Sequence, residues 1–406
     1  MAGLKLSGIN KIYPSGTLAL YNVSFELSDK EFIAVVGGEK SGKSTLLKVI
    51  AGLEEVTEGE IFIDGKNVTQ VDVKDREIAM IFRNDTLYPS LNVYDNIAFG
   101  LKMRKAPQAL IDQRVKSVAS ILGLDDLLYR KPKALTSEQK QKVAIARAIA
   151  REPRLYLLDD PIAGLDDDLK AQMRNVIINL QARVEGTFVY AAKNVNEALT
   201  MATRIIVLRE GFVQQIDAPA NLYDYPANAY VALLIGSPAI NFINNATVEK
   251  EGEDYAVSFR GGRFTLDKKI VERFAEIEEY AQSGKKVILG IRPEDLTAAK
   301  GEGLFKATVT AADEACGETY VDCEITKDFS LIAKSEGLKK DDDCAIAADL
   351  SRLYVFDAET RLTLLSRDEG YEKTGYADAD FAPLPYAEEE ELKKRLTPKV
   401  KDKKKK

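Results

Sequence analysis

The sequence predicts an α/β fold with a covered, mostly parallel sheet, followed by a smaller all-β domain of the barrel type. Three observations support this prediction. Short apolar runs alternate with helical patterns through residues 4–202, and a glycine-rich loop joins an apolar run to a helix within residues 33–53. Over residues 241–367, short strand-like runs separated by glycine, aspartate and lysine replace the helical patterns.

The individual elements follow from the spacing of apolar residues. Residues 4–36 contain three apolar runs separated by turns, which predict strands that lead into the glycine-rich loop. A further strand pair is predicted at 59–64, followed by a turn at Gly65, and helical spacing dominates residues 101–150. The remaining elements alternate in type: a buried strand at 154–159, a helix at 169–180, a strand at 187–191 and a helix at 198–202.

The chain of 406 residues is long enough for two or three domains. The first is expected over residues 1–240, with a helical subdomain at about 84–150, and the β-rich domain over 241–367. Residues 368–406 form a charged tail, which we expect to be flexible and solvated rather than a site for an anionic partner. Within it, three glutamates at 389–391 stand four residues before three basic residues at 393–395, the favourable order for a short helix.

Bulk composition narrows the function. A net charge of −7 argues against a nucleic-acid-binding body. No apolar run is long enough to span a bilayer, and the N-terminus lacks the apolar core of a signal peptide, so a cytoplasmic protein is expected. Cys316, Cys323 and Cys344 form no CxxC pair and are expected to be buried thiols rather than a metal or redox site. The absence of histidine excludes every mechanism built on an imidazole.

Residues Gly37–Ser44 match the pattern GxxxxGKS of a phosphate-binding loop, the P-loop. Its backbone N–H groups and the start of the following helix favour an anion, Lys43 would reach the β- and γ-phosphates, and the Ser44 hydroxyl would hold Mg²⁺. An incidental glycine-rich turn is the alternative, which the regular strand and helix on either side disfavour. We therefore predict ATP and Mg²⁺ as ligands, with contacts from Gly37, Gly38, Glu39, Lys40, Ser41, Gly42, Lys43, Ser44 and Thr45.

Asp159 and Asp160 end the predicted buried strand at 154–159. One carboxylate there could hold Mg²⁺ through water, and its neighbour could orient an attacking water. Taken alone this pair is a weak signal, because a solvated strand end has the same composition.

The order of several segments is more specific. After the P-loop come MIFRNDTLYPSLNVYDNIAFGLK (80–102), LTSEQKQKVAIARAIA (135–150), LYLLDDPIAGLD (155–166) and VYAAKNVNEALTMATRIIVL (189–208). This order resembles the nucleotide-binding subunit of ATP-binding cassette (ABC) importers. The segments at 214–242, GIRPEDL (290–296) and DLSRLYVFDAET (349–360) are similar to the ATPase of the sugar importers, exemplified by the maltose importer.

The resemblance implies a dimer that sandwiches two ATP molecules, each between the P-loop of one chain and the signature segment of the other. It implies that Tyr13 stacks on adenine, although a core tyrosine is the alternative, that Asp159 lies beside magnesium and that Asp166 lies on a loop crossing the dimer interface. Residues Asn84–Phe99 match the region that meets the coupling helices of integral membrane permease subunits. The resemblance therefore places the chain peripherally on the inner face of the cell membrane, with an accessory barrel that supports the dimer and can bind regulators.

The catalytic residues depart from the family pattern. The loop glutamine is Arg83, whose guanidinium has only donors and cannot ligate a cation. The glutamate after the magnesium aspartate is Asp160, one methylene shorter, and about 1 Å of misplacement can cost on the order of a hundredfold in rate. The switch histidine is Lys193, which normally stays protonated.

Two binding segments depart as well. Glu39 and Lys40 replace a serine and a glycine of the P-loop, and the signature LSGGQ reads Leu135, Thr136, Ser137, Glu138 and Gln139. Glu138 offers bulk and negative charge where backbone amides should approach a phosphate. We expect slowed or absent hydrolysis, whereas binding survives better because its residues are intact, namely Tyr13, Gly42, Lys43, Ser44 and Thr45.

Several interpretations remain open at this point. The chain is either a working motor subunit with an unusual site or a pseudo-ATPase that forms the regulatory or structural half of a heterodimer. A soluble ABC protein acting on ribosomes or in DNA repair is disfavoured by the single cassette and the importer-type barrel. Glu138 could mimic a γ-phosphate and pair across a dimer with Lys40, Arg83 or Lys193, or these changes could reflect independent drift.

Overall fold

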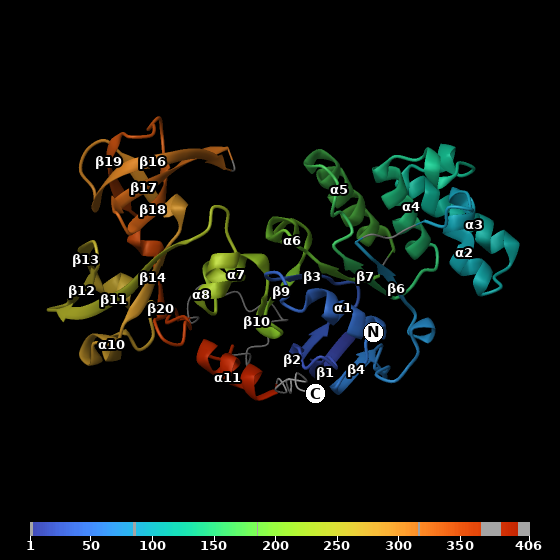
Figure 1. Ribbon diagram of the computed structural model, residues 1–406, viewed down its shortest axis with the longest axis horizontal. Coiled ribbons are helices and arrows are strands. Elements are labelled where there is room, and N and C mark those ends of the chain that lie inside the picture. The colour runs from blue at the N-terminus through green and yellow to red at the C-terminus, as the bar shows by residue number, and fades with distance from the viewer. Residues whose placement is uncertain (1–2, 84–86, 185, 316, 367–382, 397–406) are drawn as a thin grey trace, which may run out of the picture. The chain divides into compact units, whose positions relative to one another are not determined.

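The computed structural model describes residues 3–83, 87–184, 186–315, 317–366 and 383–396. The chain divides into two compact units, the first over residues 1–216 and the second over residues 217–395 (Figure 1). The α/β fold class with a following β-barrel is confirmed. Residues 217–240, which the sequence analysis grouped with the first domain, pack within the second unit.

The first unit begins with an antiparallel sheet of strand order β2-β1-β4-β5. Along β1 the buried residues Leu4, Leu6 and Ile9 alternate with exposed ones, as expected for a sheet with one face on the core. These strands confirm the predictions for the N-terminal segment. Their bounds are β1 Leu4–Ile12, β2 Leu18–Leu27, β4 Glu58–Ile63 and β5 Lys66–Asn67.

A second sheet of strand order β10-β9-β3-β8-β7-β6 forms the centre of this unit. The neighbouring pairs from β9 to β6 are parallel, and β3 and β8 are buried along their whole length. Such strands consist of continuous apolar runs because helices or strands cover both faces. The bounds are β3 Phe32–Val36, β6 Ile78–Ile81, β7 Leu155–Asp159, β8 Thr187–Ala191, β9 Arg204–Arg209 and β10 Phe212–Asp217.

Helix α1, Lys43–Ala51, contacts β2 of the antiparallel sheet and β6, β7 and β8 of the parallel sheet. Its buried face includes Leu46, Leu47 and Ile50. The helix that follows the P-loop is therefore held between two sheets, which fixes the position of its N-terminus.

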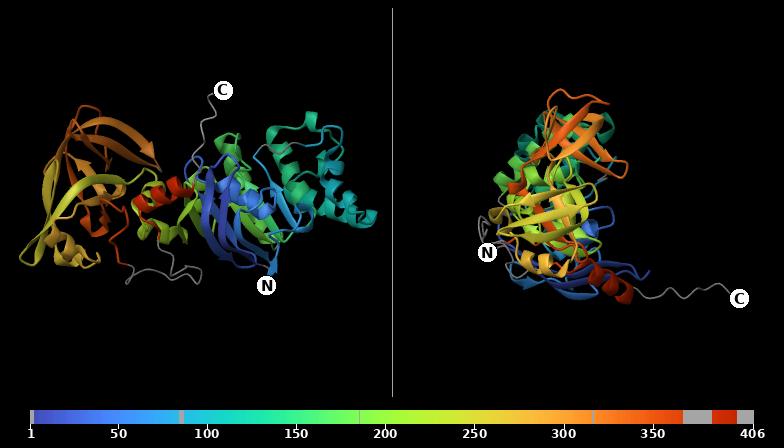
Figure 2. Two further views of the ribbon diagram at one scale, coloured as in Figure 1. Left: turned by 60° about the horizontal axis from the view of Figure 1, so that its bottom comes forward. Right: turned by 90° about the vertical axis from the view of Figure 1, so that its left-hand side faces the viewer.

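Three helices form the predicted helical subdomain beside the edge strand β6 (Figures 1 and 2). They are α2 Val93–Met103, α3 Gln108–Leu122 and α4 Ser137–Ile149, with short 3₁₀ turns at Asp125–Leu127 and Pro132–Ala134. A further 3₁₀ turn, Val73–Asp75, precedes β6. Helices α5, Asp167–Val184, and α6, Val195–Met201, complete the unit. No helix in the described ranges is both long and apolar enough to cross a membrane.

The second unit combines an antiparallel sheet of order β13-β12-β11-β14-β20 with a closed barrel of order β15-β18-β17-β16-β19. The sheet strands are β11 Asn241–Glu251, β12 Asp254–Phe259, β13 Gly262–Leu266, β14 Val287–Ile291 and β20 Tyr354–Asp357. The barrel strands are β15 Leu296–Ala299, β16 Phe305–Ala315, β17 Glu318–Thr326, β18 Phe329–Ser335 and β19 Asp343–Ala348. The helical elements are α7 Pro219–Asp224, α8 Ala229–Leu234, α9 Lys268–Val271, α10 Ile277–Ser283 and α11 Tyr386–Leu396, with 3₁₀ turns at Pro293–Asp295 and Leu350–Arg352.

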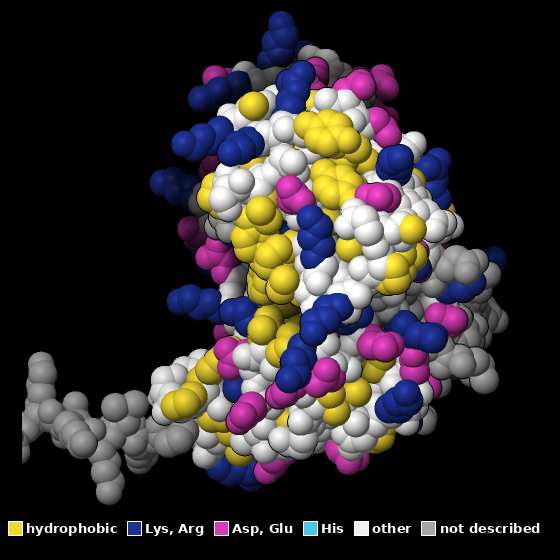
Figure 3. Space-filling view, turned by 90° about the vertical axis from the view of Figure 1, so that its right-hand side faces the viewer, with side chains coloured by type: hydrophobic (Ala, Val, Ile, Leu, Met, Phe, Trp, Pro, Cys, Tyr) yellow, Lys and Arg dark blue, Asp and Glu magenta, His cyan; other side chains and the backbone are white. Residues whose placement is uncertain are grey.

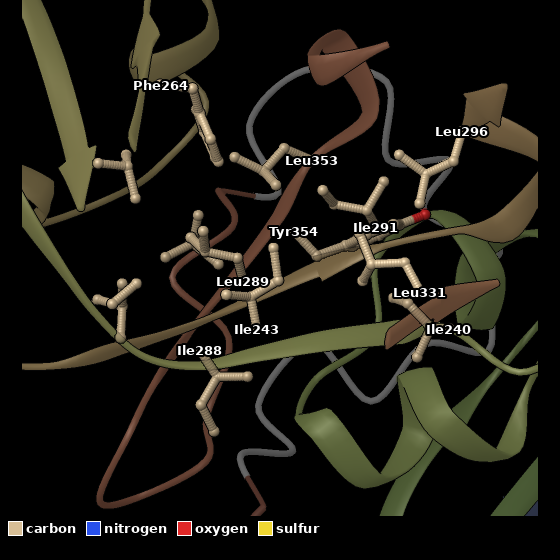
Figure 4. Packing of buried hydrophobic residues seen from close by; sticks show 14 of the residues in the cluster. Ile240, Ile243, Phe264, Ile288, Leu289, Ile291, Leu296, Leu331, Leu353 and Tyr354 are labelled. Atoms are coloured by element: carbon tan, nitrogen blue, oxygen red, sulfur yellow. The ribbon is translucent and has the colours of Figure 1, made fainter. Parts of the chain in front are cut away.

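Sheet and barrel share one hydrophobic core. Figure 4 shows Ile243, Leu289 and Ile291 of the sheet packed near Leu296 and Leu331 of the barrel, all of them buried. Cys323 and Cys344 are free, buried thiols in this core, as expected, whereas Cys316 lies outside the described residues.

The buried Arg292 is one of the residues that hold residues 217–240 in the second unit. It follows β14, is 1 % exposed and places its guanidinium 3.7 Å from the centre of the Tyr223 ring. It also donates hydrogen bonds to the carbonyl oxygens of Tyr223 and Ile235, which lie on or beside α7 and α8. A cation that satisfies several carbonyls of one segment anchors that segment.

Part of the predicted tail is helical. Helix α11 confirms the short helix expected from the order of acidic and basic residues at 389–395. Glu389 is only 2 % exposed, so this helix is not solvated on all sides. Residues 367–382 and 397–406 of the tail lie outside the described residues.

Candidate nucleotide-binding site

The P-loop connects β3 to α1 through backbone conformations that require glycine. Gly37 has φ 154° and Gly42 has φ 106°. A Cβ atom on Gly37 would lie 2.1 Å from the carbonyl oxygen of Leu208, and one on Gly42 would lie 2.6 Å from that of Ala19. The two glycines therefore let the loop turn sharply against neighbouring backbone.

Lys43 closes the loop on itself. Its Nζ donates to the carbonyl oxygens of Gly37 and Gly38, both at 2.8 Å, and to Ser41 Oγ at 3.1 Å. Burial lowers the pKa of Lys43, although the nearby carboxylates of Asp159 and Asp160 oppose that shift. An ammonium group thus lies inside the ring of backbone that would surround a phosphate.

Ser44 and Asp159 bring two oxygen ligands together from different elements. Ser44 lies in the first turn of α1, Asp159 ends β7, and the Ser44 hydroxyl donates to Asp159 Oδ1 at 2.9 Å. A hydroxyl beside a carboxylate suits Mg²⁺, which prefers oxygen ligands and keeps several waters. These two residues fit the metal that the sequence analysis assigned to them.

Tyr13 lies next to the start of α1, just after β1. Its hydroxyl is 3.2 Å from Thr45 Oγ1, and the ring is half-buried, with Lys11 Nζ 4.9 Å from its centroid. The ring therefore borders the P-loop, where an aromatic face can receive a base.

Arg83 and Asp160 form an ion pair. Arg83 Nε lies 3.7 Å from Asp160 Oδ2, and the Asp160 side chain is 14 % exposed. Burial raises the pKa of Asp160 to about 6, and the positive charge of Arg83 works against this shift. The Asp160 backbone N–H donates to Ala191 at the end of β8, which holds the carboxylate at the strand ends.

Lys193 and Glu39 form a second, looser pair. Lys193 Nζ lies 3.9 Å from Glu39 Oε1, and both side chains are mostly exposed. Lys40, between Glu39 and Ser41, has φ 60°, which costs a non-glycine residue about 1 kcal/mol. Within the described residues Lys40 makes no ion pair or side-chain hydrogen bond.

The segment Leu135–Gln139 forms the start of α4. Thr136 caps the helix: Thr136 Oγ1 accepts from the Gln139 backbone N–H at 3.2 Å, and the Gln139 side chain accepts from the Thr136 N–H at 3.1 Å. Ser137 is the first helical residue, Leu135 is buried, and Glu138 pairs with Lys142 one turn later at 2.6 Å. Across the described chain, no hydrogen bond or ion pair joins this segment to the P-loop.

Comparison with known proteins matches the chain along most of its length. An oligosaccharides import ATP-binding protein of Bacillus subtilis, MsmX, is 39 % identical over 90 % of this chain and 100 % of its own length. The chain belongs to the ATP-binding subunits of ABC transporters. A trehalose/maltose import ATP-binding protein, MalK of Thermococcus litoralis, is also 39 % identical, over 89 % of this chain and 99 % of its own.

The two family models match different units, and one solved structure superposes on about half of the chain. The ABC transporter model matches residues 20–163 and the MalK OB fold domain matches residues 236–296. The ABC protein cbiO1 of Clostridium perfringens superposes with a TM-score of 0.51 at 27 % identity, covering 54 % of this chain and 89 % of that one. The family implies that this ABC subunit binds ATP.

The helical subdomain of the ABC cassette exposes both hydrophobic and basic side chains. Hydrophobic side chains are interspersed with lysines and arginines on the face of the ABC cassette that carries α2–α4 (Figure 3). The Tyr88 and Phe99 rings lie 4.4 Å apart, and the Arg147 guanidinium lies 5.4 Å from the Tyr88 ring. Met103 nearby on α2 is 66 % exposed. Within the predicted segment Asn84–Phe99, residues 84–86 lie outside the described residues.

Two features of the ABC cassette refine the sequence-based site. The Asp166 carboxylate accepts from the Leu169 N–H at 2.9 Å, so it caps the start of α5. Glu197 of α6 was missed: it is 4 % exposed, accepts from the Tyr190 hydroxyl at 3.1 Å and raises the pKa of Asp160. No sequence pattern distinguished Glu197, because a single acid in a short helix usually faces solvent.

Proposed function

We propose that this chain is the ATP-binding subunit of a carbohydrate importer that holds ATP and Mg²⁺ in its P-loop and hydrolyses ATP very slowly or not at all. The names of the relatives, import proteins for oligosaccharides and for trehalose/maltose, and the MalK-type domain support the substrate class. Under this proposal the chain works as one of two nucleotide-binding subunits on the inner face of a membrane, beneath permease subunits.

The contact between Arg83 and Asp160 is the observation that carries the catalytic part of this proposal. A base must reach the attacking water, and the shortened Asp160 carboxylate instead faces the Arg83 guanidinium, whose Nε lies 3.7 Å away. Lys193 stands in the position of the switch histidine, and an ammonium group has three donors and no acceptor. Arg83 and Lys193 would therefore both be cations beside the reacting phosphate. A charged guanidinium or ammonium can bind the phosphate but cannot accept a proton.

By contrast, the residues expected to bind ATP and Mg²⁺ are all present. Lys43 and the P-loop amides would contact the phosphates, and Tyr13 would stack on the adenine. Ser44 and Asp159 would hold Mg²⁺, which supplies positive charge against the phosphates. The same arrangement supports the second candidate, a pseudo-ATPase that regulates or supports a catalytic partner in a heterodimer.

Purified protein tests binding and turnover separately. We expect ATP binding by isothermal titration calorimetry, and phosphate release no faster than that of a Lys43→Ala variant. Lys43→Ala should weaken ATP binding by at least about tenfold, or ~1.4 kcal/mol, because it removes the buried ammonium. Lys48→Ala, on the same helix α1, is the matched control and should bind ATP normally. Rapid phosphate release that Lys43→Ala abolishes would identify a working motor instead, and absence of ATP binding would refute the proposal.

Coupling to permease subunits needs a different test. If the aromatic and methionine surface of α2 docks onto a membrane subunit, Met103→Glu should reduce co-sedimentation of the chain with membranes from its own cells. Tyr129→Ala removes an 84 % exposed side chain outside that cluster and should have no effect. Equal co-sedimentation of both variants would place the docking surface elsewhere.

A further inference from the structure

The first turn of α4 is poorly suited to an anion. Of its amides, that of Gln139 is already bonded to Thr136 within the capping box. The amides of Ser137 and Glu138, which have no hydrogen-bond partner in the part of the chain that the structure describes, belong to residues with side chains rather than to glycine. The Glu138 carboxylate is anchored to Lys142 at 2.6 Å, so a negative charge stays at the positive end of the helix.

The P-loop side has the opposite character. Four cationic side chains belong to it or lie beside it: Lys40, Lys43, Arg83 and Lys193. Lys43 lies within the loop, and Lys193 reaches Glu39 of the loop at 3.9 Å. Lys40 has no partner among the described residues and lies in the loop itself. Three carboxylates, those of Glu39, Asp159 and Asp160, lie among these cations, so the P-loop half-site keeps a small excess of positive charge, whereas the other half-site begins with an acid.

We infer that ATP cannot join two copies of this chain, and that its P-loop half-site is completed by a non-identical ABC cassette whose signature helix begins without an acidic side chain. This inference rests on the proposed function, because it requires that the P-loop binds ATP. In a sandwich of two identical chains, each triphosphate would face Glu138 of the opposite copy. Anion would meet anion at both sites.

The in-chain ion pairs argue against the alternative in which two copies latch together without nucleotide through Glu138. Arg83 already contacts Asp160, Lys193 contacts Glu39, and Glu138 contacts Lys142. Only Lys40 would be left to pair with Glu138 across such a dimer. The structure therefore places these charges in pairs inside one chain.

Sedimentation velocity of the full chain, with and without ATP and Mg²⁺, tests the inference, because the sedimentation coefficient reports both association and closure of a dimer that is already formed. The wild-type coefficient should not change with ATP. The double variant Ser137→Gly/Glu138→Gly should show an ATP-dependent increase. An equimolar mixture of wild type and double variant should also respond, because the wild-type P-loop then meets a repaired signature segment.

Two further variants separate charge from shape and from general effects. Glu138→Gln keeps the side-chain volume and removes the charge, so it should recover part of the ATP response. Asp126→Gly removes an exposed acid elsewhere in the helical subdomain and should behave as wild type. ATP affinity is measured in parallel by calorimetry on every protein.

Each outcome decides a different question. An ATP response in the wild type equal to that of the double variant would overturn the inference, and so would a double variant that binds ATP without responding. A wild type that is compact and dimeric without ATP, and opens in Glu138→Gln, would favour the nucleotide-free latch. Failure of every protein to bind ATP would refute the proposed function instead.

Discussion

The φ angle of Gly42, 106°, lets the P-loop pass within van der Waals range of the backbone at Ala19 before α1 begins. Side chains with a Cβ rarely adopt this conformation, and here the Cβ would also meet a carbonyl oxygen that cannot move away. At the scale of the residue, the sequence pattern and the structure therefore agree for a steric reason. The two glycines of the pattern GxxxxGKS, Gly37 and Gly42, stand where a Cβ atom would clash with neighbouring backbone.

We predict that Gly42→Ala destabilises the first unit by more than about 2 kcal/mol, because strained backbone and a short contact combine. Gly65→Ala is the matched control: Gly65 has φ 74° but open space around its Cβ, so it should cost about 1 kcal/mol. Thermal unfolding by circular dichroism measures both. Equal losses in the two variants would show that the contact with Ala19 is unimportant.

A second residue, Asp295, makes the stability of the second unit depend on pH. Its side chain is 9 % exposed and lies 3.7 Å from Arg352. Burial raises the pKa of Asp295 from 3.8 to about 6, because the charged form loses hydration. The folded state thus binds the proton more tightly than the unfolded state. Its contribution favours folding below pH 4 and is lost as the pH rises to about 6.

Asp295→Asn should accordingly stabilise the protein at pH 7.5 by up to about 3 kcal/mol and have little effect at pH 4, where the wild-type carboxyl is protonated. Differential scanning calorimetry at the two pH values gives the comparison. Asp328→Asn, which alters an exposed acid paired with Arg260, serves as control and should change neither transition. A variant that melts below wild type at pH 7.5 would mean that the ion pair with Arg352 outweighs burial.

At the scale of the element, α4 depends on its capping box. Thr136 and Gln139 satisfy two donors that a helix start leaves unpaired. The threonine of the signature segment therefore stabilises a helix as well as standing where a nucleotide contact is expected. Glu138, in the first turn, adds a favourable interaction with the helix dipole and with Lys142.

Thr136→Ala should destabilise α4 by about 1 kcal/mol and accelerate hydrogen exchange in its first turns. Thr136→Ser keeps the cap and should retain most of the protection. Ser120→Ala, at an exposed position late in α3, should leave exchange in α4 unchanged. Exchange at α4 that is the same in Thr136→Ala and wild type would show that tertiary packing alone holds this helix start.

At the scale of the whole molecule, Arg292 helps to hold α7 and α8 in the second unit. Its guanidinium stacks on Tyr223 and bonds to carbonyls at both ends of the α7–α8 segment. Gly236, with φ 143°, leaves room for it: a Cβ there would lie 2.6 Å from Arg292 Nη1. Arg292 thus adds a buried charged anchor to the backbone contacts that residues 227–229 make with residues 361–363.

We expect Arg292→Met to destabilise the second unit by about 2–4 kcal/mol, because it leaves carbonyls without their charged donor. Hydrogen exchange in α7 and α8 should accelerate, and ATP affinity should stay unchanged. Arg260→Ala removes an 83 % exposed arginine and controls for loss of charge. Unaltered exchange in α7 and α8 would show that apolar packing suffices to hold the segment.

The sequence predicted those features that depend on neighbouring residues and missed those that depend on residues distant in sequence. The strands from Leu4 to Val36, the P-loop and the short helix α11 were all predicted from residue patterns that are local in sequence, and the structure confirms them. Glu197 and Arg292 escaped notice because their burial depends on elements distant in sequence. Periodicity cannot show which charged residue faces inward when its partner is a ring or a carbonyl elsewhere.

By itself, the sequence determined that this protein is an α/β cassette with a P-loop, a following barrel and altered residues at every expected catalytic position. Glycine positions, apolar spacing and residue chemistry are local properties, so they can be read without coordinates. Only the tertiary structure showed that the altered charged residues are paired within the chain: Arg83 with Asp160, Lys193 with Glu39, and Glu138 with the neighbouring Lys142. Except for the last, these pairs join residues far apart in sequence, and ion pairs form wherever folding brings opposite charges within a few ångströms.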